Sequence, residues 1–178
     1  MHSIAIESNT LTYFIEAISR AYDPQKDFSK DLAKEKIAMV RIYLYTDATY
    51  HVLPTVINEY SYINDEHWRK EHEEVVNALC FDHWKFNAQQ LEIRKDYLLR
   101  HHGKQSDCMI LAEAEAANMD FLLTYDKTFI NKLASHAEGV KIIRPSDYFD
   151  GLQIKPGSQP VKSPKPPNSL YQQKWWRI

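Results

Sequence analysis

The chain has 178 residues, of which 44% are hydrophobic and 26% are charged. This composition is typical of a globular protein with a sizeable core, and the length suggests one domain with an appended segment. No run approaches the roughly 18 uncharged apolar residues of a membrane-spanning helix, and no secretory signal is visible. The two cysteines are too few for a disulfide framework. We therefore expect a cytoplasmic protein with no membrane contact.

The net charge of -2 is unevenly distributed along the chain. Residues 1–150 hold 17 Lys and Arg against 24 Asp and Glu, which gives -7, whereas residues 151–178 hold five bases and no acid, which gives +5. The second segment also contains five of the eight prolines and ends in LYQQKWWRI. The sequence therefore predicts an acidic domain over 1–150 and a proline-rich, basic and aromatic tail over 151–178.

Short apolar strands alternate with helices along the predicted domain. In chain order, we predict a strand at 3–7, helices at 11–22 and 30–45, a strand at 49–53, a helix beginning at Pro54, a nearly continuous helical stretch over 66–101, an alanine-rich helix at 107–119 capped by Ser106, a strand at 120–126, a short helix at 127–134, a strand at 140–144 and a closing turn at 145–150. This alternation predicts an α/β fold with a central, mainly parallel sheet and helices on both faces.

Four acidic residues fall where such a sheet would bring them together. Glu7 and Asp126 lie at the carboxyl ends of the first and third predicted strands. Glu59 lies on the helix after the second strand, and Asp107 opens the helix that leads into the third. Ligands of open parallel sheets bind beyond these strand ends. Clustered carboxylates need a cation, and all-oxygen ligands suit Mg²⁺ or Mn²⁺, ions that promote phosphodiester hydrolysis. Taken singly, each acid is more often a helix-terminal or solvated surface residue.

The combination of motifs is more specific than any single acid. IAIESNTL, PTVINEY, SDCMILAEAEAANMDFLLTYDKTF and KIIRPSDYF together resemble the PIN domain, the fold of VapC-type toxin ribonucleases, and the match covers residues 3 to about 150. The resemblance implies a PIN-like three-layer fold. It also implies a Mg²⁺ or Mn²⁺ site whose catalytic, metal-binding acids are Glu7, Glu59, Asp107 and Asp126. Asn9 and Thr124 would orient these acids. The first acid of PIN domains is an aspartate, so Glu7 departs from the pattern.

The resemblance implies a metal-dependent endoribonuclease that hydrolyses RNA phosphodiester bonds. The resembling proteins include the toxins of toxin–antitoxin pairs. The resemblance therefore also implies a toxin whose partner is an antitoxin protein. Because Glu7 replaces the family aspartate, an alternative is a catalytically weakened PIN domain that binds RNA or protein. A phosphatase of different fold is a third interpretation, but the Asp-x-Asp expected after the first strand is missing.

The tail offers a second group of candidate residues, Lys174, Trp175, Trp176 and Arg177. Tryptophan rings beside basic side chains can stack on RNA bases and neutralise phosphates. They can also dock on a partner, or fold back to cover apolar surface of their own chain. We favour docking on this chain or on a second copy, as in a homodimer, over RNA contact.

Two other features suggest weaker interpretations. Cys80 and His83 resemble half of a zinc knuckle without a second half at suitable spacing. We interpret them, and the pair His101 and His102, as residues of a polar helix face. Cys108 has small apolar neighbours and is predicted to belong to the core.

Overall fold

The computed structural model describes residues 2–19, 22–79 and 84–178, and its centre is a parallel sheet. The strands of this sheet are β1 (Ser3–Ile6), β2 (Thr49–His51), β3 (Phe121–Leu123) and β4 (Lys141–Ile143). Their order across the sheet is β2-β1-β3-β4, and Ile4 of β1 is in register with Tyr50 on one side and Phe121 on the other. The predicted parallel sheet is confirmed.

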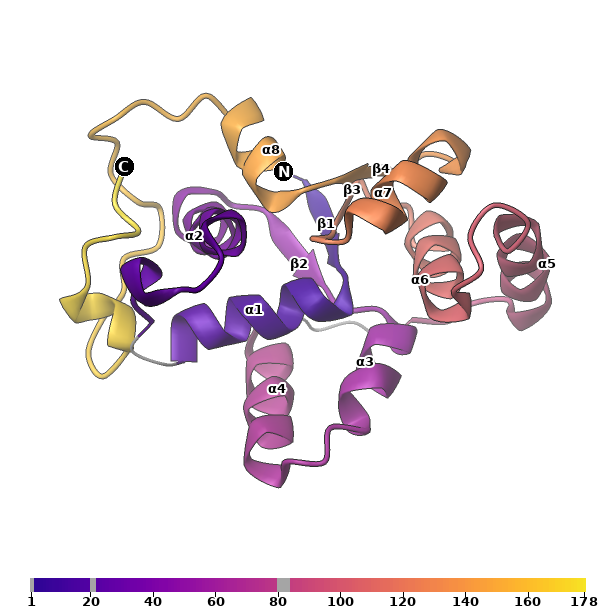
Figure 1. Ribbon diagram of the computed structural model, residues 1–178, viewed down its shortest axis with the longest axis horizontal. Coiled ribbons are helices and arrows are strands. Elements are labelled where there is room, and N and C mark those ends of the chain that lie inside the picture. The colour runs from indigo at the N-terminus through magenta and orange to yellow at the C-terminus, as the bar shows by residue number, and fades with distance from the viewer. Residues whose placement is uncertain (1, 20–21, 80–83) are drawn as a thin grey trace.

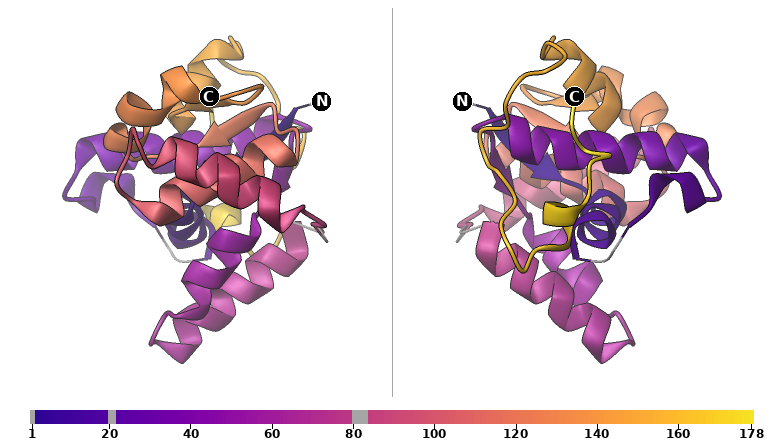
Figure 2. Two further views of the ribbon diagram at one scale, coloured as in Figure 1. Left: turned by 90° about the vertical axis from the view of Figure 1, so that its right-hand side faces the viewer. Right: turned by 90° about the vertical axis from the view of Figure 1, so that its left-hand side faces the viewer.

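Helices cover both faces of this sheet (Figure 1). They are α1 (Ser8–Ser19), α2 (Lys30–Tyr45), α3 (Pro54–Ser61), α4 (Glu66–Leu79), α5 (Ala88–Leu98), α6 (Gln105–Ala116), α7 (Lys127–Leu133) and α8 (Pro145–Gly151). Figure 2 shows α5 and α6 in front of the sheet from one side, and α1 and α2 in front of it from the other. The expected α/β architecture with helices on both faces is therefore confirmed.

The core lies between the sheet and these two helical layers. The inner strands β1 and β3 are apolar on both faces, and Ile4, Ile6 and Leu122 are fully buried between the layers. Helix α2 begins after Ser29, whose Oγ accepts the Leu32 N–H at 3.2 Å.

Among the described residues, no helix has the length and apolar character needed to cross a membrane.

Two of the predicted helical ranges differ clearly from the structure. The first helix begins at Ser8 rather than at residue 11, and residues 20 and 21 of its predicted range lie outside the described residues. The predicted stretch over 66–101 is two helices, α4 and α5, and residues 84–87 between them are not helical. Residues 80–83, which include Cys80 and His83, lie outside the described residues.

The cap predicted for the alanine-rich helix is wrong. Helix α6 begins at Gln105, so Ser106 lies inside its first turn and the N-cap position belongs to Lys104. Lys104 has the extended backbone of an N-cap residue, with φ -94° and ψ 111°. The intrinsic preference of serine for this position is overridden here, and Lys104 is placed beside the first turn of α6.

The tail folds back across α1 and α2 (Figure 2). The Lys162 N–H donates to the Leu44 carbonyl at 2.9 Å, and Ser169 Oγ donates to the Ile18 carbonyl at 3.0 Å. The guanidinium of Arg41 on α2 donates to consecutive carbonyls near the end of the tail, those of Trp175 at 3.4 Å, Trp176 at 3.2 Å and Arg177 at 2.8 Å. The tail therefore contributes to the packed structure rather than extending into solvent.

Replacing Trp176 by alanine should lower the free energy of unfolding by about 3 kcal/mol, because its side chain is only 4% exposed and a cavity would remain. Urea denaturation followed by circular dichroism measures this loss. Tyr171→Ala is the matched control in the same tail, since Tyr171 is 54% exposed and its loss should cost less than about 0.5 kcal/mol. Equal effects of the two changes would show that the tail is not packed as described.

Candidate functional site

Glu7 links the central strand to the first helix. Its carboxylate is buried and accepts the Asn9 N–H on Oε1 at 3.0 Å and the Thr10 N–H on Oε2 at 3.3 Å. Thr10 Oγ1 donates to the same oxygen at 3.4 Å. Glu7 therefore caps α1 with its side chain. Asn9 holds Glu7 through its backbone N–H.

Thr124 lies between Glu7 and Asp126. Its hydroxyl donates to Glu7 Oε2 at 3.4 Å and accepts the Asp126 N–H at 3.0 Å. Asp126 in turn caps α7, because its Oδ1 accepts the Thr128 N–H at 2.7 Å and the Phe129 N–H at 3.1 Å. Thr124 thus connects two of the predicted acids, but the Asp126 carboxylate binds the first turn of α7.

Asp107 is held by two basic side chains. Lys104 Nζ lies 2.7 Å from Asp107 Oδ1, and His102 Nε2 lies 2.7 Å from Asp107 Oδ2. The His102 ring also stacks on Phe129 of α7, with ring centroids 6.3 Å apart. Both oxygens of this buried carboxylate are therefore occupied within the structure. His102 is not simply a surface residue of a polar helix, as the sequence suggested.

Glu59 faces an open cleft of about 410 Å³ between α1 and α3. Ser8 Oγ donates a hydrogen bond to Glu59 Oε2. The cleft is lined by polar residues and by apolar or aromatic residues, namely Glu7, Ser8, Asn9, Thr12, Glu59 and Lys104, with Leu11, Val56, Tyr60, Tyr62 and Ile63. Glu7, Glu59 and Lys104 therefore share one solvent-accessible space.

Three acids, Glu7, Glu59 and Asp107, interact electrostatically with one base, Lys104. Burial raises the pKa of Glu7 against the opposing effect of the Asn9 and Thr10 N–H groups, and the charge of Asp107 raises it further. Burial alone would lower the pKa of Lys104. The hydrogen bond to Asp107 and the charges of the acids outweigh burial, so the pKa of Lys104 is raised. The acids of the cleft thus favour a positive charge among them.

The residues present fit a hard cation in donor type and in charge. Carboxylate oxygens are preferred ligands of Mg²⁺ and Mn²⁺, and the ammonium of Lys104 already lies where the acids favour a cation. Within the described ranges, however, no three His, Cys, Asp or Glu side chains are arranged to hold one metal ion. Asp126 Oδ1 is engaged as the cap of α7.

Several residues of the site were missed in the sequence. Ser8 bonds Glu59, His102 and Lys104 bond Asp107, and Thr10 bonds Glu7. Glu113, on α6, is buried and accepts the N–H and hydroxyl of Thr55 at the start of α3, at 3.0 and 2.8 Å. The spacing of Lys104 and Asp107, three residues apart at the start of a helix, is the one signal that the sequence contained.

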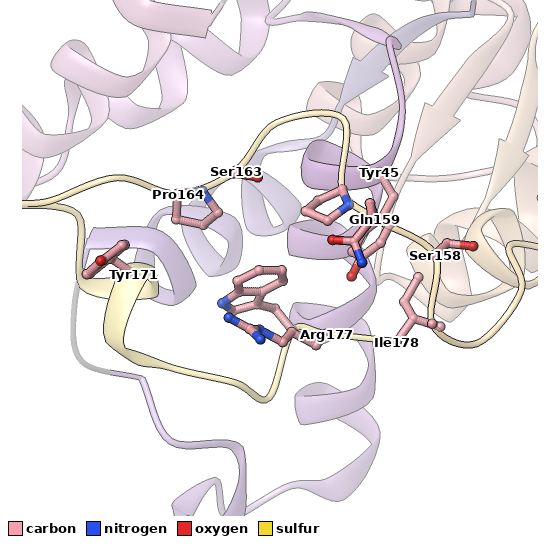
Figure 3. Close-up of a pocket in the computed structure, with 11 residues that line it drawn as sticks. Tyr45, Ser158, Gln159, Ser163, Pro164, Tyr171, Arg177 and Ile178 are labelled. Carbon is pink, nitrogen blue, oxygen red and sulfur yellow. The ribbon is translucent and has the colours of Figure 1, made fainter.

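The tail candidates lie away from this cleft. Arg177 covers the Trp176 ring at 5.3 Å, and both line a second pocket of about 410 Å³ between the tail and Tyr45 (Figure 3). Trp176 is buried and its indole N–H donates to Leu170, while Trp175 packs edge-on against Tyr22. Lys174 is exposed.

The tail meets α1 at Ile18, the end opposite Glu7. Because α1 has 12 residues, about 18 Å of helix separates the tail contact at Ile18 from Glu7.

Two remaining sequence interpretations concern cysteine and histidine. Cys108 is fully buried, which raises the pKa of its thiol to about 11 with the charge of Asp107 adding to the effect. Its predicted place in the core is confirmed. The His101 ring stacks on His136 with centroids 3.6 Å apart.

No family model matches this chain, and no curated protein matches it. The resemblance to PIN domains therefore depends on the sequence motifs.

Replacing Glu7 by glutamine should stabilise the protein at neutral pH. The pKa of Glu7 is raised in the folded state, so its contribution to stability is complete below the unfolded pKa of about 4.3 and is lost as pH rises through the folded value. Glutamine removes this loss, and the difference from the parent chain should vanish below about pH 4. Urea unfolding between pH 4 and 8 measures it, with the exposed Glu66→Gln as control. A Glu7→Gln protein that is less stable at pH 7 would contradict the expectation.

Proposed function

We propose that this protein is a Mg²⁺- or Mn²⁺-dependent endoribonuclease of the PIN type. The observation that carries the proposal is that Glu7 and Glu59 line one cleft with Lys104, whose ammonium pairs with Asp107 at 2.7 Å. This open cleft lies at the carboxyl edge of a parallel sheet. An open cleft suits a polymeric substrate whose chain continues beyond the reacting phosphate. We place this activity in the cytoplasm, and the same resemblance makes an antitoxin protein a candidate partner.

In this proposal the acids hold the metal, and neighbouring residues hold the acids. Glu7, Glu59 and Asp107 would bind the metal, which when present supplies charge neutralisation and water activation for phosphodiester hydrolysis. Thr10 and the Asn9 N–H fix Glu7, Ser8 fixes Glu59, and His102 fixes Asp107. These contacts fix the orientation of each carboxylate. Asp126 is the fourth acid of the proposed site, and Thr124 links it to Glu7.

Tyr62 offers a contact for the substrate. It lines the mouth of the cleft and its side chain is 75% exposed. An exposed aromatic ring beside a phosphate site can stack on an unpaired base. This favours single-stranded or looped RNA over a duplex, in which the bases are already stacked.

A second candidate function is binding of RNA or protein without cleavage. Lys104 neutralises Asp107, and Asp126 is committed to α7, so the site as folded can exist without a metal. This alternative predicts RNA binding that neither a divalent metal nor EDTA alters. Cleavage assays therefore separate the two candidates.

Mixed RNA incubated with the purified chain should be cut when Mn²⁺ or Mg²⁺ is present, and EDTA should stop the cutting. Asp107→Asn should reduce the rate at least about 100-fold, because a ligand charge is lost at the reacting centre. Gel analysis of labelled RNA measures the rate. Asp150→Asn, which removes an exposed acid paired with Lys34, should cut as fast as the parent. An Asp107→Asn protein with unchanged rate would refute the site assignment.

Shortening Glu7 to aspartate should raise the cleavage rate severalfold while changing metal affinity little. Aspartate is a preferred N-cap residue and can keep the hydrogen bonds to the first turn of α1. Its carboxylate would also stand where the PIN pattern has it, and a shift of about 1 Å at a reacting centre can change rates roughly 100-fold. Single-turnover cleavage and Mn²⁺ titration of both proteins measure the two quantities. Equal or slower cleavage would mean that the surrounding residues are adapted to glutamate.

A further inference from the structure

We propose that the pocket between the tail and α2 binds a nucleoside monophosphate, with the phosphate on Arg177 and the base against the ring of Tyr171. The pocket has a volume of about 410 Å³, within the range of about 300–1,000 Å³ that is typical of small-molecule sites. Figure 3 shows that two arms of the tail form its walls, with Pro164 on one arm and Arg177 on the other. This site lies outside the acidic cleft and does not depend on the proposed nuclease activity.

Both arms of the tail are anchored to α2, so contacts within the chain fix the walls of the pocket. Lys162 on the first arm donates its N–H to the Leu44 carbonyl at 2.9 Å. The second arm is held by Arg41, whose guanidinium donates to the carbonyls of residues 175, 176 and 177. The Gly157 N–H donates to the Ile178 carbonyl at 3.1 Å and joins the arms. A preformed pocket loses less conformational entropy when a ligand binds.

The side chains of the pocket favour an anion. None of the eleven described residues that line it has an acidic side chain. The guanidinium of Arg177 lies over the Trp176 ring, 5.3 Å from its centre, and in the part of the chain that the structure describes it pairs with no acid. A guanidinium over an aromatic face keeps the N–H donors in its own plane available. Two of these donors match two oxygens of a phosphate.

The other lining residues suit a flat ring with polar edges. Tyr171 is 54% exposed, so its ring is available, and Pro160 and Pro164 add apolar surface beside it. Stacking of a base on an aromatic side chain contributes about 1–3 kcal/mol. Gln159 and Ser163 supply an amide and a hydroxyl that can bond the edge of a base or a ribose. A phosphate linked to a base therefore uses the charge and the ring surface of the pocket together.

The shape of the pocket favours a single nucleotide over an RNA strand. Gly157 and Ile178 both line it, and the hydrogen bond between them leaves no path on that side for a polymer that continues beyond the phosphate. A nucleoside monophosphate ends within the pocket and needs no such path. The ligand class is therefore a small molecule.

Calorimetric titration of the full chain with adenosine 5′-monophosphate (AMP) in the presence of EDTA tests the proposal. EDTA removes divalent ions, so neither RNA cleavage nor a metal contributes to the signal. AMP should bind. Inorganic phosphate and adenosine should each bind at least about tenfold more weakly, because each lacks one of the two contacts.

Two variants and a matched control assign the contacts. Arg177→Met should weaken AMP binding at least about tenfold, because a charge-assisted hydrogen-bonded pair is lost. Tyr171→Ala should weaken the binding of AMP and leave that of phosphate unchanged. Lys174→Met is the control, since Lys174 is an exposed base of the same tail that does not line the pocket, and it should bind AMP as the parent does.

Four results would overturn the proposal. The first is a parent chain that binds no AMP at about 1 mM, and the second is an Arg177→Met protein with the affinity of the parent. Equal affinities for AMP and phosphate would reduce the pocket to a site for simple anions. A 5′-phosphorylated tri-adenylate that binds more tightly than AMP would assign the pocket to RNA instead. Circular dichroism of each variant checks that a loss of binding is not a loss of fold.

Discussion

Parallel pairing of β1 with β2 on one side and β3 on the other requires the chain to cross back over the sheet before each new strand begins. These crossings are helical, so the carboxyl end of each strand adjoins the N-terminus of a helix at the same edge. Glu7 occupies such a junction between β1 and α1, and Asp126 another between β3 and α7. The positive ends of the helices favour acids there. The gathering of carboxylates is thus a consequence of the topology, before any ligand is considered.

The buried acids at this edge are stabilised in two different ways. Glu7 and Glu113 accept hydrogen bonds from neutral N–H and O–H groups, so their charges remain uncompensated and burial raises the pKa of each. Asp107 has instead a cation on one oxygen and a histidine on the other. Since the cost of burying a charge falls when it is paired, Asp107 and Lys104 form the ionic centre of the cleft. Removing either partner leaves the charge of the other without its counter-charge. Substitutions at this pair should therefore disturb the site most.

The sequence predicted elements well where the apolar pattern was strong, as for α2 at Lys30–Tyr45 and for the four strands. It also placed Glu7 and Asp126 at strand ends, because topology alone determines that position. Side-chain pairing was not predictable. The start of α1 was missed because a glutamate rarely caps a helix, and Ser106 was chosen over Lys104 because intrinsic preference favours serine. His102 contacts Asp107 only because Gly103 and the start of α6 turn the chain back, which no periodicity reveals.

Capping a helix and binding a metal place the same demand on a carboxylate at a strand end, since both require oxygens directed at positive charge. This is why Glu7 and Asp126 do not by themselves distinguish a metal site from ordinary helix capping. Asp107 differs from both, because its side chain does not cap α6 and its oxygens bind the side chains of His102 and Lys104. This buried carboxylate has no capping role, and its charge is compensated by the pair with Lys104 and the contact with His102. The topology therefore accounts for the positions of Glu7 and Asp126, whereas side-chain pairing accounts for Asp107.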